Sequence, residues 1–202
     1  MSRITRVVVL VTALMSLFAV LSSAAGATGW DNSGSTSFTA TGGPGTLSVG
    51  ANALTCADSG TTGTSPTSSA TGDLVTGTAT FTGCTLGGVP AHMSCTYTLT
   101  ATGQAGGVTS VTIDATCDAF VFASAACHVR GTTHGTYTNP VGTTKGKLTL
   151  AHSSGTLTVF NAPGATCLLG NNVGATLTAQ TLTITTALGG TGTLGPVITR
   201  TP

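Results

Sequence analysis

Hydrophobic and polar residues alternate with a period of two along most of this chain. At residues 95–102 the sequence CTYTLTAT puts Tyr97, Leu99 and Ala101 on one face and threonines on the other. Successive side chains of a β-strand point to opposite faces, so this pattern is typical of a strand with one buried face. The alternation resumes after GQAGG, in VTSVTIDAT. Two such runs around a glycine-containing loop predict a β-hairpin.

Further strand candidates follow along the chain. They lie at residues 37–41, 46–49, 53–56, 75–84, 119–123, 127–137, 146–152, 155–161 and 174–186. In the last of these, Leu177 and Leu182 are five positions apart, so the inward parity changes and we expect a β-bulge near Gln180. Short strands separated by Gly, Asn and Pro, with no convincing helical repeat after the N-terminal segment, predict an all-β fold. We expect an antiparallel β-sandwich or a barrel-like fold.

The N-terminal segment predicts export. Arg3 and Arg6 precede an apolar run of 15 residues at 7–21, and small residues follow it. This is the build of a secretory signal peptide, and the run is shorter than the roughly 20 residues of a membrane-spanning helix. We expect cleavage after Ala27, with cleavage after Ala25 as the alternative. The mature chain is then a single secreted β domain over residues 28–202, without a membrane span.

One segment lacks the alternation. Residues 58–73 read DSGTTGTSPTSSATGD, a low-complexity stretch of Gly, Ser and Thr. Polar tracts of this composition are flexible. We therefore predict a long flexible loop there, with room for a loose strand within it. The functional alternative is a loop that carries glycans or contacts a ligand.

Charge is scarce in the mature sequence. It keeps two Lys and two Arg against five Asp, and it contains no Glu. Binding to nucleic acid needs clustered Lys and Arg that neutralise phosphates. We therefore exclude nucleic acid as a partner. Serine and threonine occupy many positions where charges usually stand, so we expect a surface rich in hydroxyl groups.

The cysteines indicate disulfide bonds. All six lie in the exported part: Cys56, Cys84, Cys95, Cys117, Cys127 and Cys167. An even number of cysteines in an oxidising compartment implies disulfides, and six allow 15 pairings. Zinc sites need closely spaced Cys or His pairs, which this chain lacks, so we predict no metal and no cofactor.

The predicted hairpin suggests one pairing. A turn near residue 105 or 106 brings Cys95 opposite Cys117 at a distance that a disulfide can span. The remaining cysteines are then assigned as Cys56 with Cys84 and Cys127 with Cys167. A bond between Cys84 and Cys95 is the main rival.

Chemistry-bearing residues are few, and their strongest cluster lies on one predicted strand. His128, Arg130 and His134 share parity, so they can face the same way, with Asp114 or Asp118 across a hairpin. An exposed polar strand face is the simpler interpretation, and a binding face is the functional one. The chain has no Gly-x-Ser-x-Gly elbow and few carboxylates for acid–base chemistry, so we predict no enzymatic activity and no catalytic residues.

Several short sequence segments occur in a characteristic order along the chain. SFTATGGPGTLSV, LTC, ATFTGC and CHVRGTTHGTYTN are followed by a late cysteine before a Thr-rich last strand. Together they resemble a group of small secreted Thr/Gly-rich β proteins of actinobacteria. At one remove the chain is similar to the exported family of alkane-oxidation activators. The second resemblance implies an extracellular accessory protein that acts on hydrophobic substrate or at the cell surface, and it brings no catalytic residue.

These observations lead to three hypotheses of function. The first is a secreted, non-enzymatic structural or interaction protein of the bacterial cell surface or medium. The second is a β-sandwich binding module for carbohydrate, such as cell-surface polysaccharide, or for an apolar ligand. The third is a hydrolase that uses His128, His134 and the neighbouring Asp residues. We expect Trp30, directly after the cleavage site, to be the aromatic residue least suited to the core.

Overall fold

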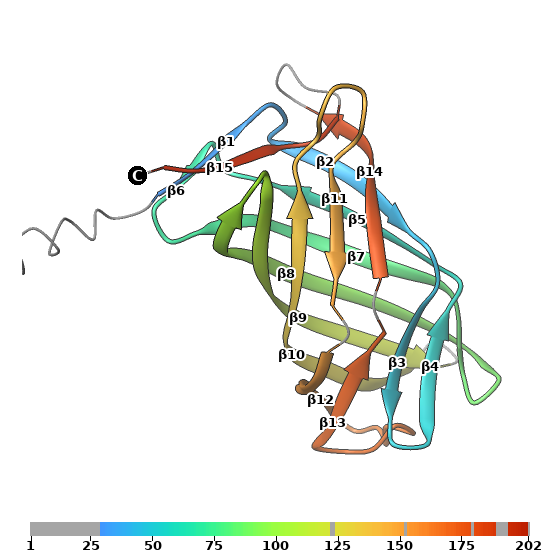
Figure 1. Cartoon of the computed structure of the whole chain (residues 1–202). Helices are drawn as coiled ribbons and strands as arrows, with labels where there is room; N and C mark the ends of the chain where they lie inside the picture. Colours follow the sequence, from blue (N-terminus) through green and yellow to red (C-terminus); the bar gives the residue numbers. More distant parts are fainter. Residues whose placement is uncertain (1–28, 122–123, 152, 179, 189–193, 202) are drawn as a thin grey trace, which may run out of the picture.

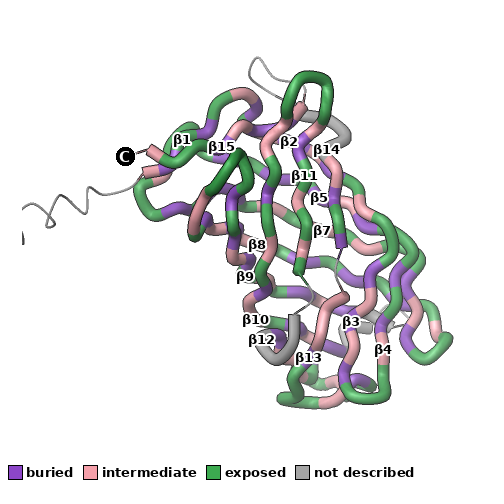
Figure 2. The backbone as a smooth tube through the Cα atoms, viewed as in Figure 1, coloured by how far each residue is buried: buried purple, intermediate pink, exposed green. Residues whose placement is uncertain are grey.

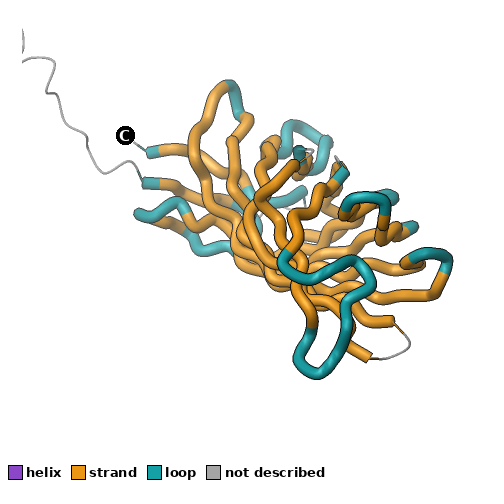
Figure 3. Tube along the Cα trace, turned by 90° about the horizontal axis from the view of Figure 1, so that it is seen from below, coloured by secondary structure: helices purple, strands orange, loops and turns teal. Residues whose placement is uncertain are grey.

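The structure of the chain is a computed structural model that describes residues 29–121, 124–151, 153–178, 180–188 and 194–201 (Figure 1). In these ranges it is all-β, and loops lie mainly at the ends of strands (Figure 3). The strands are β1 (Trp30–Ser33), β2 (Ser37–Gly42), β3 (Gly45–Val49), β4 (Asn52–Cys56), β5 (Asp58–Thr64), β6 (Ser68–Ser69), β7 (Asp73–Leu86), β8 (Val89–Ala105), β9 (Val108–Val121), β10 (Ser124–Thr138), β11 (Lys147–Leu150), β12 (Ser153–Asn161), β13 (Val173–Leu177), β14 (Gln180–Leu188) and β15 (Val197–Arg200). No helix in the described ranges is long and apolar enough to cross a membrane.

The large sheet closes on itself as an antiparallel barrel. The long strands β7, β8, β9 and β10 pair in sequence order and form one continuous side. The other side consists of short strands in two tiers. One tier runs from β10 through β11, β14, β2 and β5 to β7, and the other from β10 through β12, β13, β3 and β4 to β7. The sequence allowed either a sandwich or a barrel, and the structure has the closed form.

Short strands that follow each other in sequence lie end to end across the two tiers, separated by a brief interruption. The pairs are β2 and β3, β4 and β5, β11 and β12, and β13 and β14. Between β2 and β3 the interruption falls at Gly43 and Pro44, and Pro44 has no N–H for a ladder hydrogen bond. The Gln180 side chain donates from Nε2 to the Gly43 carbonyl at 2.6 Å. The bulge expected near Gln180 is instead an interruption between β13 and β14, where Ala179 lies outside the described residues. The change in parity is present, since Leu177 and Gln180 both line the barrel interior.

Two apolar clusters fill much of the interior. One includes the three disulfides together with Leu54, Met93 and Val159. The other is built around Trp30 and Phe38. Figure 2 shows the corresponding alternation of buried and exposed residues along the strands.

Both ends of the barrel are covered. The small sheet β15-β1-β6 brings Trp30 and Ile198 onto the second cluster, so our expectation that Trp30 stays outside the core is wrong. A tryptophan buries a large apolar area, which favours a covered position over an exposed one. At the opposite end, Cys167 and Leu169 of the loop before β13 are buried in the first cluster.

The disulfides join Cys56 to Cys84, Cys95 to Cys117 and Cys127 to Cys167. These are the pairs assigned from the sequence. Cys95 and Cys117 are direct cross-strand partners, whereas the β8–β9 turn pairs Ala105 with Val108. Between the turn and the disulfide the strand pairing shifts by one residue, and this shift occurs at the irregularity between Ala101 and Gly103. Without it, Cys95 would stand opposite Asp118.

The flexible loop predicted over residues 58–73 is wrong for most of its length. Residues 58–64 form β5, and β6 and the start of β7 account for several others. Threonine is β-branched and suits a pleated strand, so a Thr/Gly tract can be a strand when the fold needs small inward residues. Gly63 shows this need, because a Cβ there would lie 2.8 Å from Phe38 Cζ and 2.9 Å from Val75 Cγ1.

One other strand assignment changes. Residues 119–121 are the end of β9 and not a separate strand, because the β8–β9 hairpin continues past the disulfide. Residues 122 and 123 lie outside the described residues, as does the expected signal peptide. No separate strand was predicted for β1 or β15, which form the small covering sheet.

Gly63→Ala should lower the free energy of unfolding by about 1 to 3 kcal/mol, because overpacking forces neighbouring side chains or backbone to move. Gly60→Ala on the same strand is the matched control, since a Cβ there meets nothing within 4 Å. Urea unfolding of both variants checks this. Equal stability of the two variants would contradict the packing assigned to Gly63.

A buried tyrosine should make stability fall at high pH. The Tyr137 hydroxyl donates to the Pro196 carbonyl at 2.8 Å, and burial raises the pKa of Tyr137 well above its ordinary value. Between about pH 10 and the folded pKa, the unfolded chain releases this proton and the folded protein keeps it. The free energy of unfolding therefore falls by about 1.4 kcal/mol per pH unit in that window. Urea titrations at pH 9 and 11 should show a smaller fall for Tyr137→Phe than for the original chain.

Candidate functional site

The barrel interior contains an apolar cavity. Its volume is about 100 Å³, and it lies where the two core clusters meet. The apolar side chains lining it include Leu47, Phe81, Met93, Ile113, Leu157 and Leu182. They come from both tiers of short strands and from the long strands. Among the described lining residues none carries a charge.

Two polar atoms in this lining have no hydrogen-bond partner among the described residues. They are Thr133 Oγ1 and Gln180 Oε1. Thr133 is 4% exposed and Gln180 is 6% exposed. Burying a polar group without a partner costs about 1 to 3 kcal/mol, so most buried polar groups in native proteins are paired. Both oxygens are buried behind the apolar atoms of the cavity wall, so the accessible lining of the cavity is apolar.

The other polar groups of the lining are paired. Thr61 Oγ1 lies 2.8 Å from the Tyr97 hydroxyl and 2.9 Å from the Thr78 carbonyl oxygen. Ser59 accepts from Gln180 Nε2 at 2.9 Å. Burial raises the pKa of Tyr97 above its usual 10.0, and the hydrogen bond with Thr61 lowers it in part. Tyr97 is thus a neutral wall of the cavity at physiological pH.

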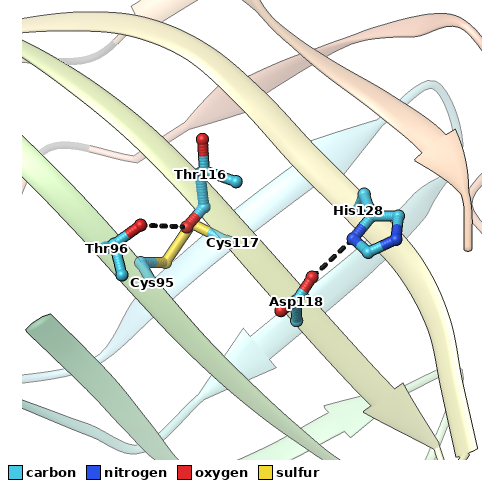
Figure 4. Close-up of polar contacts among 6 residues, drawn as sticks. All are labelled: Cys95, Thr96, Thr116, Cys117, Asp118 and His128. Atoms are coloured by element: carbon cyan, nitrogen blue, oxygen red, sulfur yellow. Dashed lines mark hydrogen bonds and ion pairs between the residues drawn. A yellow bond between two sulfur atoms is a disulfide. The ribbon is translucent and has the colours of Figure 1, made fainter.

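The residues expected to form a binding face lie on the outside of the barrel. His128, Arg130 and His134 all belong to β10, and they share parity as the sequence predicts. His128 Nδ1 lies 2.5 Å from Asp118 Oδ1, with side-chain exposures of 23% and 44% (Figure 4). His134 Nδ1 is 3.3 Å from Thr112 Oγ1.

The cluster divides into separate cross-strand contacts. Asp114, the second acidic candidate, accepts from Thr132 Oγ1 at 2.5 Å and does not join the histidines. Polar cross-strand pairs of this kind are an ordinary feature of a sheet surface and contribute little to stability. The His128–Asp118 distance also meets the reach that proton transfer requires. His134 is three outward positions further along β10 than His128, beside a different partner.

The outer surface is hollowed next to this face. A groove of about 920 Å³ runs across β2, β5, β7, β8, β9 and β10; threonine is the commonest residue of its lining, and Asp114 and Arg130 lie at one side. A row of inward residues with little or no side chain crosses the same strands: Gly63, Gly77, Ala115 and Gly131, interrupted by Tyr97. Because small residues allow the sheet to bend inward, the outer face becomes concave there.

His128 and Arg130 share a second, smaller depression. Its volume is about 500 Å³, and Phe160, Asn161 and Pro163 are among the other residues that line it. His134 does not belong to it. The structure thus brings His128 and Arg130 to one surface feature and separates His134 from them.

Within the described ranges, no group of three or more His, Cys, Asp or Glu side chains could hold a metal ion. Comparison of the chain with protein-family models, curated proteins and solved structures finds no match.

Sequence reasoning missed the cavity residues Thr133 and Gln180. A signal for Gln180 exists in the sequence, because it occupies an inward position at the parity change between Leu177 and Leu182. Thr133 stands at an inward position between His134 and Thr132 on a strand where Val129 and Tyr137 are also inward. One threonine in such a position is indistinguishable by pattern from the many outward threonines nearby.

Thr133→Val should raise the free energy of unfolding by about 1 kcal/mol, because it removes a buried hydroxyl that has no partner. Thr61→Val is the matched control on the same cavity, and it should lower stability by a similar amount, because it removes a paired hydroxyl. Urea unfolding measures both. A loss of stability in Thr133→Val would show that its hydroxyl is hydrogen-bonded.

Proposed function

We propose that this chain is an exported, non-enzymatic binding protein that holds a small apolar molecule inside its barrel. The observation that carries the proposal is the apolar cavity between the two core clusters. Closed barrels of about eight strands have interiors that are filled by side chains or that hold one small ligand. In this barrel the inward side chains leave a cavity at the height where the short strands are interrupted.

The size of the cavity defines the size of the ligand. Protein interiors pack densely and contain few voids larger than a water molecule. Apolar cavities of about 150 Å³ bind benzene or xenon, and this cavity measures about 100 Å³. The ligand class is therefore a compact hydrocarbon body of roughly one small ring.

The outer groove supports a carbohydrate ligand less well. Neighbouring threonines on its floor lie within hydrogen-bond distance of each other, with Oγ1 separations of 3.0 Å for Thr62 and Thr78 and 3.4 Å for Thr64 and Thr76. Its aromatic members, Phe38 and Tyr97, belong to inward positions of the sheet. The groove thus offers hydroxyl groups that already have partners, without an exposed aromatic platform. The interior is the more specific site.

Export to an oxidising compartment is part of the proposal. It is supported by the signal-like sequence at residues 1–27 and by three disulfides that involve every cysteine of the chain. An exported carrier that shields a small apolar compound fits a role in the bacterial medium or at the cell surface. The His128–Asp118 pair then serves as a cross-strand contact on the outside of this carrier.

Benzene should bind the folded protein and stabilise it. A ligand that binds only the folded state at ten times its Kd raises the free energy of unfolding by about 1.4 kcal/mol. The test is urea unfolding of the disulfide-bonded mature chain with and without benzene, together with direct titration by calorimetry.

Ala79→Leu is the informative variant, because Ala79 lines the cavity and a larger side chain there would occupy it. It should abolish benzene binding while the protein stays folded. Thr80→Ala, at the exposed neighbouring position of β7, is the matched control and should bind as the original chain does. Unchanged binding in Ala79→Leu, or no binding by the original chain, would refute the proposal.

A further inference from the structure

Strand β15 is held at one end of the barrel by side-chain amides. One edge of β15 pairs with β1. On the other edge, Asn139 accepts from the Ile198 N–H through Oδ1 at 2.9 Å and donates from Nδ2 to the Ile198 carbonyl at 2.7 Å. Gln104 donates from Nε2 to the same carbonyl at 2.6 Å and accepts from the Arg200 N–H through Oε1 at 2.9 Å. Two amide side chains therefore stand where a neighbouring strand would be.

A small cavity lies beneath β15. Its volume is about 20 Å³, and Pro196 and Ile198 form part of its lining. It adjoins the apolar cavity of about 100 Å³, because some residues line both cavities: Thr61, Tyr97, Leu148 and Leu182. Protein interiors contain few such voids. In this barrel two of them follow each other from the middle of the interior to the underside of β15.

The opposite end of the barrel is held by a covalent bond (Figure 1). There the Cys127–Cys167 disulfide ties the loop before β13 to β10. The three disulfides use all six cysteines, and none of these lies in β1, β6 or β15. The small sheet is held by hydrogen bonds and apolar contacts, among them the bond from the Tyr137 hydroxyl to the Pro196 carbonyl at 2.8 Å. Contacts of this kind can open locally without global unfolding.

We propose that β15 is the gate through which the apolar ligand enters and leaves the barrel. This inference rests on the proposed function, because it names the entry route to the same cavity. Outward movement of β15 takes Pro196 and Ile198 out of the lining of the small cavity and opens it to solvent. The larger cavity lies directly behind, and the ligand passes between the side chains that line both.

The open state of this gate is rare. Opening exposes Ile198, which is 1% exposed in the structure, and breaks the hydrogen bonds that Asn139 and Gln104 make with its peptide groups. The closed state therefore dominates, and it is the state that holds the ligand. Because exchange passes through the open state, the association and dissociation rates both scale with its population, whereas Kd does not.

Asn139→Ala tests the gate, because it removes two hydrogen bonds from the edge of β15 and lines neither cavity. Water replaces these bonds in part, so the population of the open state should rise about tenfold. Benzene should then associate and dissociate about tenfold faster, with a change in Kd of less than about twofold. NMR exchange spectroscopy on the full disulfide-bonded mature chain measures both rates.

Asn161→Ala is the matched control at the opposite end of the barrel. It removes the side-chain oxygen that accepts from the Cys167 N–H at 3.0 Å, while the disulfide keeps the loop in place. Both benzene rates should stay as in the original chain. Faster exchange in Asn161→Ala with unchanged rates in Asn139→Ala would put the entry route at that end and overturn the inference. Unchanged rates in both variants would also overturn it.

A measurement without ligand separates this inference from the proposed function. Hydrogen exchange of the Ile198 amide in the original chain should report an opening free energy below that of the amides in the β8–β9 ladder, because β15 opens on its own. Equal values would show that β15 opens only on global unfolding, and they would overturn the gate even if benzene binds. Absence of benzene binding to the original chain would overturn the proposed function and, with it, the entry route.

Discussion

Closure of the sheet is the constraint from which the other features follow. When the hydrogen-bonded ladder returns from β10 to β7 by two routes, all inward side chains must share one narrow interior. Large residues on one strand then require very small ones opposite, as Gly63 is required beside Phe38 and Val75. The same requirement explains why so much of the chain alternates Thr with Gly or Ala. Glycine and alanine leave room on the inside, and threonine favours the strand while it faces outward.

The buried, unpaired side-chain oxygen of Gln180 follows from how the barrel bends. At the interruption after β2, Gly43 and Pro44 leave the ladder, and the Gly43 carbonyl needs a donor inside the wall. Gln180 supplies it from the corresponding interruption of its own strand. The amide that donates in this way leaves its own oxygen buried in the wall without a partner. The cost of that unpaired oxygen therefore originates in backbone geometry.

The period-two alternation predicted the all-β class and most of the long strands, because alternation directly reflects one buried face. The cysteine spacing led to the disulfide pairs, although the extra residue near Thr102 that aligns Cys95 with Cys117 has no sequence signature. The pattern failed at residues 58–64, where inward Ser, Thr and Gly carry no apolar signal, and at Trp30, whose cover comes from the distant strand β15. The alternation placed His128, Arg130 and His134 on one face. The cavity, by contrast, depends on where along the barrel the separate short strands are interrupted, and no single segment of the sequence encodes that position.

The threonine-covered exterior also affects how the protein meets other molecules. With cations limited to a few positions and several threonine hydroxyls within hydrogen-bond distance of each other across strands, the surface generates little long-range field. Electrostatic steering is what makes association rates sensitive to ionic strength. A neutral ligand approaching this neutral exterior encounters the protein by diffusion alone. For the proposed apolar ligand, the rate of binding should then depend on how the barrel admits it and little on ionic strength.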